Sequence, residues 1–225
     1  SGRPARTSPL YDRLLARGAV FGEKLGWERP NWFASAALGE ADHDVYTYER
    51  QNWFAAVGRE HTACRDAAVL IDQTSFAKCA LKGPDALTAL DWICANNVRR
   101  PVGSLTYTQM LNDQGGIEAD LTVARVADDE FYIVTGTGFA SHDFDWIRRN
   151  IPSGANAQLF DVTSAYSVLT LMGPASRSIL STGTAADLSN EAFPFGPSQT
   201  IGIARCPVRA PRIAAQLASC ADDFL

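Results

Sequence analysis

Residues 107–123 predict two strands joined by a tight turn at a pair of glycines. The run is YTQMLNDQGGIEADLTV, and the turn falls at Gly115-Gly116. The second strand places Asp120 inside the apolar run Ile117, Leu121 and Val123. An ionised carboxylate in a half-buried strand is costly unless a partner hydrogen-bonds it. We therefore expect Asp120 either to pair within the protein or to face a ligand. The simplest alternative is an aspartate near a turn that caps backbone amides.

Size and charge exclude several classes of protein. The chain has 225 residues and a formal net charge of −5, with acidic and basic residues interspersed, which argues against a nucleic-acid partner. No apolar run approaches the roughly 20 residues that span a bilayer, so we expect no membrane partner. The five cysteines form no CxxC pair and the three histidines are dispersed, so we expect no metal site. Reduced thiols suit a cytoplasmic location, or the mitochondrial matrix in a eukaryote.

Helix and strand signals follow one another in an α+β pattern. They predict helices over residues 57–66, 84–94 and 141–149, the last with Ser141 as its N-cap, and strands over residues 69–72, 131–134 and 167–172. A strand, a Gly-Pro pair and a helix occur around Gly83-Pro84 and again around Gly173-Pro174. This repetition suggests two related units.

The first 50 or so residues have no clear periodicity and predict an extended connecting segment. They are rich in Trp, Pro, Gly and Arg. Large rings such as those of Trp27, Trp32 and Trp53 suit docking onto a partner. They are equally suited to packing over this chain's own domain.

Two short motifs resemble known functional sites but lack the features that those sites require. Gly136 and Gly138 lack the third glycine of a dinucleotide-binding fingerprint. Ser141-His142-Asp143 suggests a hydrolase, but neighbouring residues on a helix point in different directions and the chain has no GxSxG elbow.

An ordered set of motifs resembles the aminomethyltransferase (T-protein) family of the glycine cleavage system. Besides the hairpin motif, the set comprises Asp72-Gln73-Thr74-Ser75-Phe76, Gly83-Pro84-Asp85-Ala86, Ala95-Asn96-Asn97-Val98, Asp161-Val162-Thr163-Ser164 and Gly173-Pro174-Ala175-Ser176-Arg177. The N-terminal run through Gly26-Trp27-Glu28-Arg29-Pro30 resembles the stretch that joins the flavin half to the folate half in dimethylglycine and sarcosine dehydrogenases. The resemblance extends from about Thr7 to Arg212.

The resemblance implies an α+β, aminomethyltransferase-like folate-binding fold with mixed or antiparallel sheets and packed helices. It implies a connector over residues 1–56 that follows a flavin domain, and a folate-binding domain over residues 57–212. Residues 213–225 have no family counterpart and look truncated or frameshifted, so we expect the family's C-terminal β-barrel domain to be lacking.

By the same resemblance, Asp120 is the catalytic residue. It would hydrogen-bond near the reactive nitrogens of tetrahydrofolate, in a partly apolar pocket that raises its pKa. Tyr107 would line the pterin pocket, unless it is a cross-strand core aromatic. An amide at Asn96 or Asn97 would reach the ligand or, more simply, close a turn. The remaining cofactor-binding residues would be Thr122, Thr135 and Gly136, the last through close backbone approach.

The function implied is tetrahydrofolate-binding one-carbon transfer that forms 5,10-methylenetetrahydrofolate. FAD would belong only to the upstream flavin domain, which would be a partner of this chain. Two alternatives stay open: an inactive remnant that serves as a structural or interaction module, and a folate-dependent demethylase with another methyl donor. Whether this chain alone is an enzyme, which amine it serves and its oligomeric state are left open.

Overall fold

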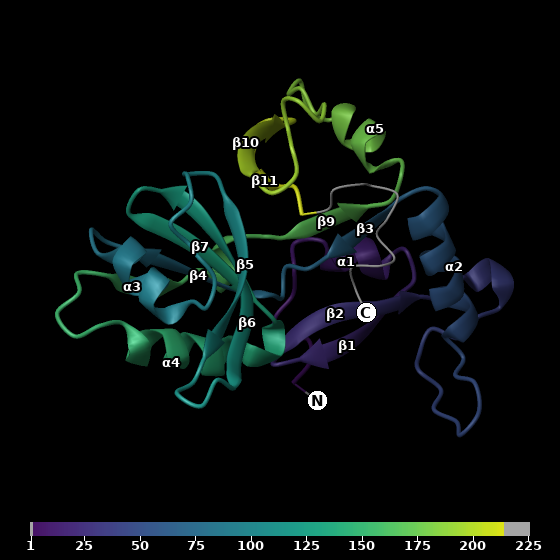
Figure 1. Ribbon diagram of the computed structural model, residues 1–225. Helices are drawn as coiled ribbons and strands as arrows, with labels where there is room; N and C mark the ends of the chain where they lie inside the picture. The colour runs from purple at the N-terminus through teal and green to yellow at the C-terminus, as the bar shows by residue number, and fades with distance from the viewer. Residues whose placement is uncertain (1, 214–225) are drawn as a thin grey trace. The chain divides into compact units, whose positions relative to one another are not determined.

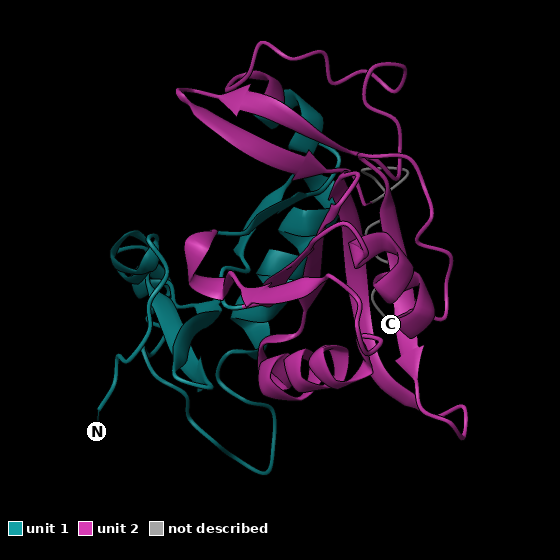
Figure 2. Ribbon diagram, turned by 90° about the vertical axis from the view of Figure 1, so that its left-hand side faces the viewer, with its two compact units in different colours: residues 1–75, 167–180, 216–225 teal, residues 76–166, 181–215 magenta. Residues whose placement is uncertain are grey.

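The computed structural model describes residues 2–213 of the chain, so the predicted tail over residues 213–225 lies outside it apart from Ile213. The described residues form two compact units (Figure 2), one from residues 2–75 and 167–180, the other from residues 76–166 and 181–213. Figure 1 labels the elements. In the first unit they are α1 (Tyr11–Leu15), β1 (Ala19–Lys24), β2 (Trp27–Phe33), η1 (Ala36–Leu38), α2 (Phe54–Asp66), β3 (Val69–Asp72) and β9 (Leu169–Met172), with α5 (Ser176–Ser181) beginning in it.

The second unit is built on a five-stranded antiparallel sheet in the order β5-β6-β7-β4-β8. Its elements are β4 (Ala77–Lys82), α3 (Ala86–Ile93), β5 (Leu105–Leu111), β6 (Ile117–Ala127), β7 (Glu130–Thr135), η2 (Thr137–Phe139), α4 (Ala140–Asn150), β8 (Gln158–Asp161), η3 (Thr163–Ala165), and the hairpin β10 (Ser198–Ile203) with β11 (Cys206–Pro211). Helices α3 and α4 cover one face of the sheet.

Strict alternation in the strands makes that face the core. In β6, Ala119, Leu121 and Val123 are buried, while the residues between them point to the other face. The core continues through Phe131 and Ile133 of β7 to the apolar sides of the two helices. In these strands, therefore, every second side chain faces the core.

The first unit has its own small core, in which β2 packs on α2. Val20, Trp32 and Ala56 are buried together, and the Trp32 ring N–H donates to Asp44 at 2.8 Å. Trp27 is buried as well. The first 50 or so residues, predicted as an extended connecting segment, contain regular elements, namely α1 and the β1–β2 hairpin. For Trp27 and Trp32, packing within the chain's own unit is the alternative that holds.

Most predicted elements are present with small shifts at their ends. Strand β3 covers the predicted residues 69–72, and α2 begins at Phe54 rather than at residue 57. The prediction of Ser141 as an N-cap is wrong: α4 begins at Ala140, Phe139 occupies the cap, and no side chain caps it. The short helix η2 leads directly into α4, so the turn that Ser141 would have capped lies earlier in the chain.

The two Gly-Pro pairs form the same local structure. Gly83 follows β4 and Gly173 follows β9, both with positive φ, of 136° and 114°, and each pair is followed by a helix. A Cβ on either glycine would meet a backbone carbonyl, since the oxygen of Asn156 would lie 2.2 Å from it at Gly83 and that of Ala67 2.5 Å from it at Gly173. Only glycine therefore fits these two turns.

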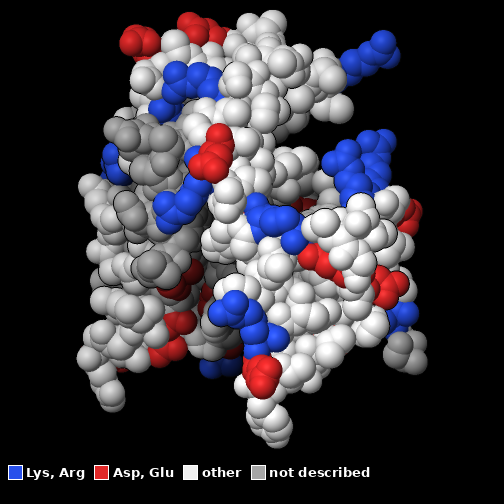
Figure 3. Space-filling view, turned by 90° about the vertical axis from the view of Figure 1, so that its right-hand side faces the viewer, with Lys and Arg blue, Asp and Glu red and all other residues white. Residues whose placement is uncertain are grey.

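The α+β class with antiparallel sheets and packed helices is confirmed. Over residues 2–213, none of the helices combines the length and the apolar character needed to cross a membrane. On the face drawn in Figure 3, Lys and Arg side chains lie among Asp and Glu side chains rather than gathering by sign.

The substitution Gly83→Ala should lower the free energy of unfolding by at least about 2 kcal/mol, because a Cβ there clashes with the backbone as well as straining φ. Gly154→Ala is the matched control: its φ is also positive, at 84°, but nothing lies within 4 Å of the added Cβ. It should cost only about 1 kcal/mol. Urea unfolding of both variants measures the difference, and equal losses would contradict the predicted clash.

Candidate functional site

The open face of the five-stranded sheet, away from α3 and α4, gathers three of the predicted site residues. Thr122 of β6 lies opposite Tyr107 of β5 on one side and Val134 of β7 on the other. Val134 lies opposite Lys78 of β4, whose side chain is buried, so this face is open at β5 and β6. Asp120 lies opposite Gln109, two residues along β6 from Thr122. Because side chains at i and i+2 share a face, Tyr107, Asp120 and Thr122 point the same way.

Asp120 is exposed and is held by two side chains of the neighbouring strand. The Tyr107 hydroxyl donates to one carboxylate oxygen at 2.8 Å, and the Gln109 amide donates to the other at 3.4 Å. Of its apolar neighbours in β6, Leu121 and Val123 point to the opposite face, whereas Ile117 is exposed, so a partly apolar pocket around Asp120 stays a prediction. The carboxylate pairs with side chains, so backbone-amide capping does not describe it.

Tyr107 is 61% exposed, which excludes the alternative that it is a core aromatic. Its ring reaches diagonally across the ladder to Asp120, a span that a large side chain covers between strands. The hydrogen bond to Asp120 is the main cause that raises the pKa of the Tyr107 hydroxyl, because ionising the phenol would place two negative charges side by side.

Asn97 closes a turn, as the simpler of its two interpretations predicted. Its side-chain oxygen accepts the Arg99 backbone N–H at 2.8 Å. Its neighbour Asn96 ties the same loop to the sheet, donating its amide to the Tyr107 carbonyl at 3.0 Å and its backbone N–H to the Thr108 hydroxyl. This loop covers the free edge of β5 beside Tyr107.

Thr135 and Gly136 do not join this group. Thr135 follows Val134, so it points to the helix-covered face, where it is buried and its hydroxyl donates to Asp143 at 2.5 Å. Gly136 leaves the end of β7, and a Cβ on it would lie 3.2 Å from the Phe139 ring. A role for either residue in binding a cofactor stays a prediction.

Two groups of polar residues were not predicted. Gln109 shares the motif and the face of Tyr107, so period-two alternation alone would have found it. His142 bonds Asp143 at 3.0 Å and pairs with Glu118 at 3.4 Å, which shows that adjacency on a helix did not keep His142 and Asp143 apart. No group of three His, Cys, Asp or Glu side chains within residues 2–213 is arranged to hold a metal ion.

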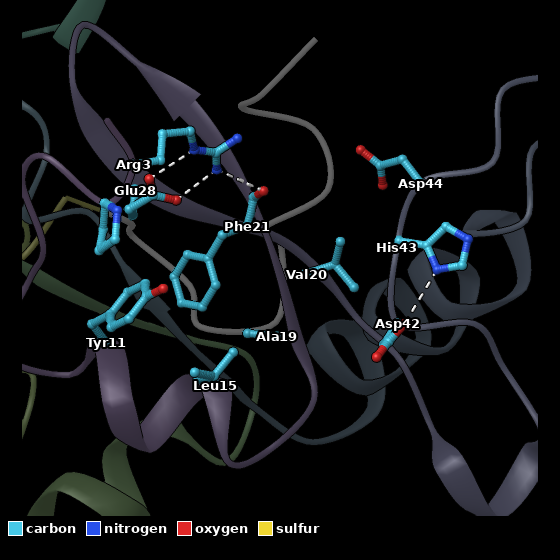
Figure 4. A pocket seen from close by; sticks show the side chains of 11 residues that line it. Arg3, Tyr11, Leu15, Ala19, Val20, Phe21, Glu28, Asp42, His43 and Asp44 are labelled. Atoms are coloured by element: carbon cyan, nitrogen blue, oxygen red, sulfur yellow. Dashed lines mark hydrogen bonds and ion pairs between the residues drawn. The ribbon is translucent and has the colours of Figure 1, made fainter. Parts of the chain in front are cut away.

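A groove of about 360 Å³ lies in the first unit and contains none of the predicted site residues. Figure 4 shows Arg3 within it, reaching Glu28 and the Phe21 carbonyl, beside the rings of Tyr11 and Phe21, which contact each other at a tilt of 43°. The Glu28 side chain is only 3% exposed, and its hydrogen bonds from Arg3 lower its pKa. We assign this ion pair to the stability of the β1–β2 hairpin.

The family described as GCVT N-terminal domain matches residues 10–214. The chain therefore belongs to that family, and the resemblance drawn from its motifs is confirmed.

The chain is similar to individual members of two groups, mitochondrial dehydrogenases and an aminomethyltransferase. The chain is 37% identical to mouse mitochondrial sarcosine dehydrogenase, covering 95% of this chain and 27% of that protein, and 33% identical to human mitochondrial dimethylglycine dehydrogenase, covering 95% and 24%. The crystal structure of glycine cleavage system aminomethyltransferase T from Bartonella henselae superposes with a TM-score of 0.65 at 25% identity, covering 86% of this chain and 47% of that one. This chain thus spans about a quarter of the length of those two dehydrogenases.

Removing Arg3 should destabilise the first unit, because the substitution Arg3→Ala leaves the buried Glu28 carboxylate without its partner. We expect a loss of about 1 to 3 kcal/mol at pH 7 in urea unfolding. A lowered carboxylate pKa stabilises the fold above the ordinary value near 4.5 and loses that contribution as the pH falls through the lowered pKa. The deficit of Arg3→Ala should therefore shrink towards pH 3. Arg13→Ala on α1 is the control, and an equal loss there would refute the assignment.

The Asp120→Asn substitution should lower the pKa of Tyr107 towards its ordinary value of about 10, because the neutral amide removes the charge that opposes ionisation. NMR titration of ring-labelled tyrosine measures this, with Tyr107→Phe to assign the signal. Asp128→Asn, an exposed carboxylate paired with Arg125, should leave the titration unchanged. A Tyr107 midpoint that does not respond to Asp120→Asn would mean that the two side chains are not bonded in solution.

Proposed function

We propose that this chain binds tetrahydrofolate on the open face of its sheet and takes part in one-carbon transfer that forms 5,10-methylenetetrahydrofolate. The single observation that carries the proposal is Asp120, an exposed carboxylate held in place by Tyr107 and Gln109 inside the motif that led to the family. The domain itself is of the aminomethyltransferase type and is related to sarcosine and dimethylglycine dehydrogenases.

The side chains on this face suit a flat heterocycle that carries N–H groups. A carboxylate accepts such hydrogen bonds strongly, and an exposed tyrosine ring offers an apolar surface to the plane of a ligand. Thr122, half-buried beside Tyr107, adds a hydroxyl that can donate or accept. The donor set therefore fits a reduced pterin, with Asp120 as its charged anchor.

Each residue then has a definite task. Tyr107 and Gln109 each engage a different oxygen of Asp120, which fixes the plane of the carboxylate. A ligand lying over Tyr107 would remove water from Asp120 and so strengthen its hydrogen bonds. Asp120 could then orient an amine and accept a proton from it, while the folate supplies the one-carbon chemistry.

The proposal also includes the source of the one-carbon unit and the protein part that releases it. The two mammalian relatives are named as dehydrogenases and are about four times as long as this chain. We propose a flavin-containing part as the partner that oxidises an N-methyl amine, with residues 1–56 joining it to the folate-binding residues 57–212.

Tetrahydrofolate titration tests the proposal. At about 100 times its Kd, a ligand that binds only the folded chain stabilises it by about 2.7 kcal/mol, which a thermal shift detects. Asp120→Asn should weaken binding about 10-fold to 100-fold in calorimetry, because a charged hydrogen bond contributes roughly 1.5 to 3 kcal/mol. It should also strongly reduce one-carbon transfer in the enzyme that contains this chain.

Asp128→Asn is again the control, since it removes an exposed carboxylate from the turn between β6 and β7 and leaves the open face unchanged. Wild-type affinity in Asp120→Asn would refute the assignment of Asp120. No stabilisation by tetrahydrofolate would favour the alternative of a structural or interaction module.

A further inference from the structure

A continuous chain of polar contacts joins three elements next to the proposed site. The Asn112 amide donates to Glu118 at 2.8 Å, Glu118 pairs with the His142 Nε2 at 3.4 Å, and the His142 Nδ1 bonds Asp143 at 3.0 Å. Thr135 closes the series with its bond to Asp143. The β5–β6 hairpin is thereby linked to the first turn of α4 and to the end of β7.

Glu118 is the extra residue of a β-bulge. Met110 pairs with Ala119 and Leu111 with Ile117, so Glu118 has no partner in β5. A bulge bends its strand and redirects the side chains beside it. Asp120 comes two residues after Glu118, so its direction relative to Tyr107 depends on how this bulge is held.

Asn112 makes the turn side of the bulge rigid. Its side-chain oxygen accepts the backbone N–H groups of Gln114 and Gly116, and its own N–H donates to the Gly116 carbonyl at 2.9 Å. The hairpin tip is therefore fixed by its own sequence. The contact between Glu118 and His142 joins the bulge to α4.

That contact depends on the charge of the histidine. Both ring nitrogens face carboxylate oxygens, which can only accept hydrogen bonds. An imidazolium can donate to both, whereas a neutral ring must turn one lone pair towards a carboxylate. The Asp143 side chain is 2% exposed and also accepts from Thr135, while Glu118 is 24% exposed and lies at the longer distance. Loss of the proton should therefore release Glu118.

The surroundings favour the charged ring. The hydrogen bond to Asp143 is the main cause that raises the pKa of His142, and the charges of Asp143 and Glu118 add to it. Among the described residues, the charged groups that act on the pKa of the ring are Asp143 and Glu118. Of the cations on the strands packed against α4, Lys78 of β4 donates to the Tyr166 carbonyl, Lys82 of β4 pairs with Glu130, and Arg125 of β6 pairs with Asp128.

We propose that His142, as an imidazolium, is a positioning residue for Asp120: it ties the bulge at Glu118 to α4 and so holds the strand from which Asp120 projects. Its relevance to one-carbon transfer rests on the proposed function above. A histidine whose pKa is raised in the fold stabilises that fold fully below the ordinary value near 6.5, and this contribution is lost as the pH rises through the raised pKa. Asp120 should thus be held best below about pH 6.5 and less firmly as the pH rises through the raised pKa of His142.

NMR titration of the 225-residue chain from pH 5.5 to 9 tests the positioning directly. The chain has only three histidines, so His142→Gln assigns the ring signal. We expect a His142 midpoint above about 6.5, with the backbone amides of Glu118 and Asp120 shifting at the same midpoint. In His142→Gln those amide shifts should disappear.

Glu118→Gln keeps the shape of the side chain and should lower the His142 midpoint, because it removes a negative charge beside the ring. Asp145→Asn is the matched control, because this carboxylate of α4 pairs with Arg149 instead, and the midpoint should not change. An Asp120 amide that does not respond at the His142 midpoint would overturn the proposal, as would a midpoint at or below about 6.5.

Tetrahydrofolate binding at pH 6 and pH 8 separates this inference from the proposed function. A pH dependence that is present in the wild type and absent in His142→Gln supports both. Amide shifts that follow His142 in a chain that binds no folate would refute the proposed function and leave the positioning role of His142 standing.

Discussion

The antiparallel register of β6 between β5 and β7 is the constraint on which the second unit depends. In one strand it buries Ala119, Leu121 and Val123 under the helices while turning Asp120 and Thr122 to the open face. A slip of one residue would exchange the two sets and place a carboxylate in the core. The same pairing that builds the core therefore decides which side chains are available to a ligand.

A network of polar side chains connects the helix-covered side of the sheet with the strand that carries the proposed site. Thr135 and Asp143 are buried on the helix side, yet through His142 and Glu118 they contact the strand that carries Asp120. Since Asp120 is exposed and is held by two side chains of β5, its position depends on the backbone around it. Polar groups on one face can in this way support a site on the other.

Family membership rests on patterns whose physical reasons are visible in the structure. Gly83 and Gly173 lie against backbone carbonyls, and the Asn112 side chain organises the hairpin turn by donating one hydrogen bond and accepting two. Such positions tolerate few residues, which explains why short motifs identified the family when a solved aminomethyltransferase structure is only 25% identical. The first unit was less predictable, because Trp27 and Trp32 are buried in a hairpin that their local sequence pattern does not predict.

The sequence by itself determined the α+β class, the strands β4 to β7 and the helices α3 and α4 of the second unit, but not β8, β10 or β11. It also determined the shared face of Tyr107, Asp120 and Thr122, because period-two alternation is a local property. It could not show that Asp120 is exposed, since burial of a strand face depends on where the helices pack. The tertiary structure alone decided that Thr135 points away from Asp120 and that Glu118 meets His142. A bulge and a helix distant in sequence created that contact, and no local pattern encodes it.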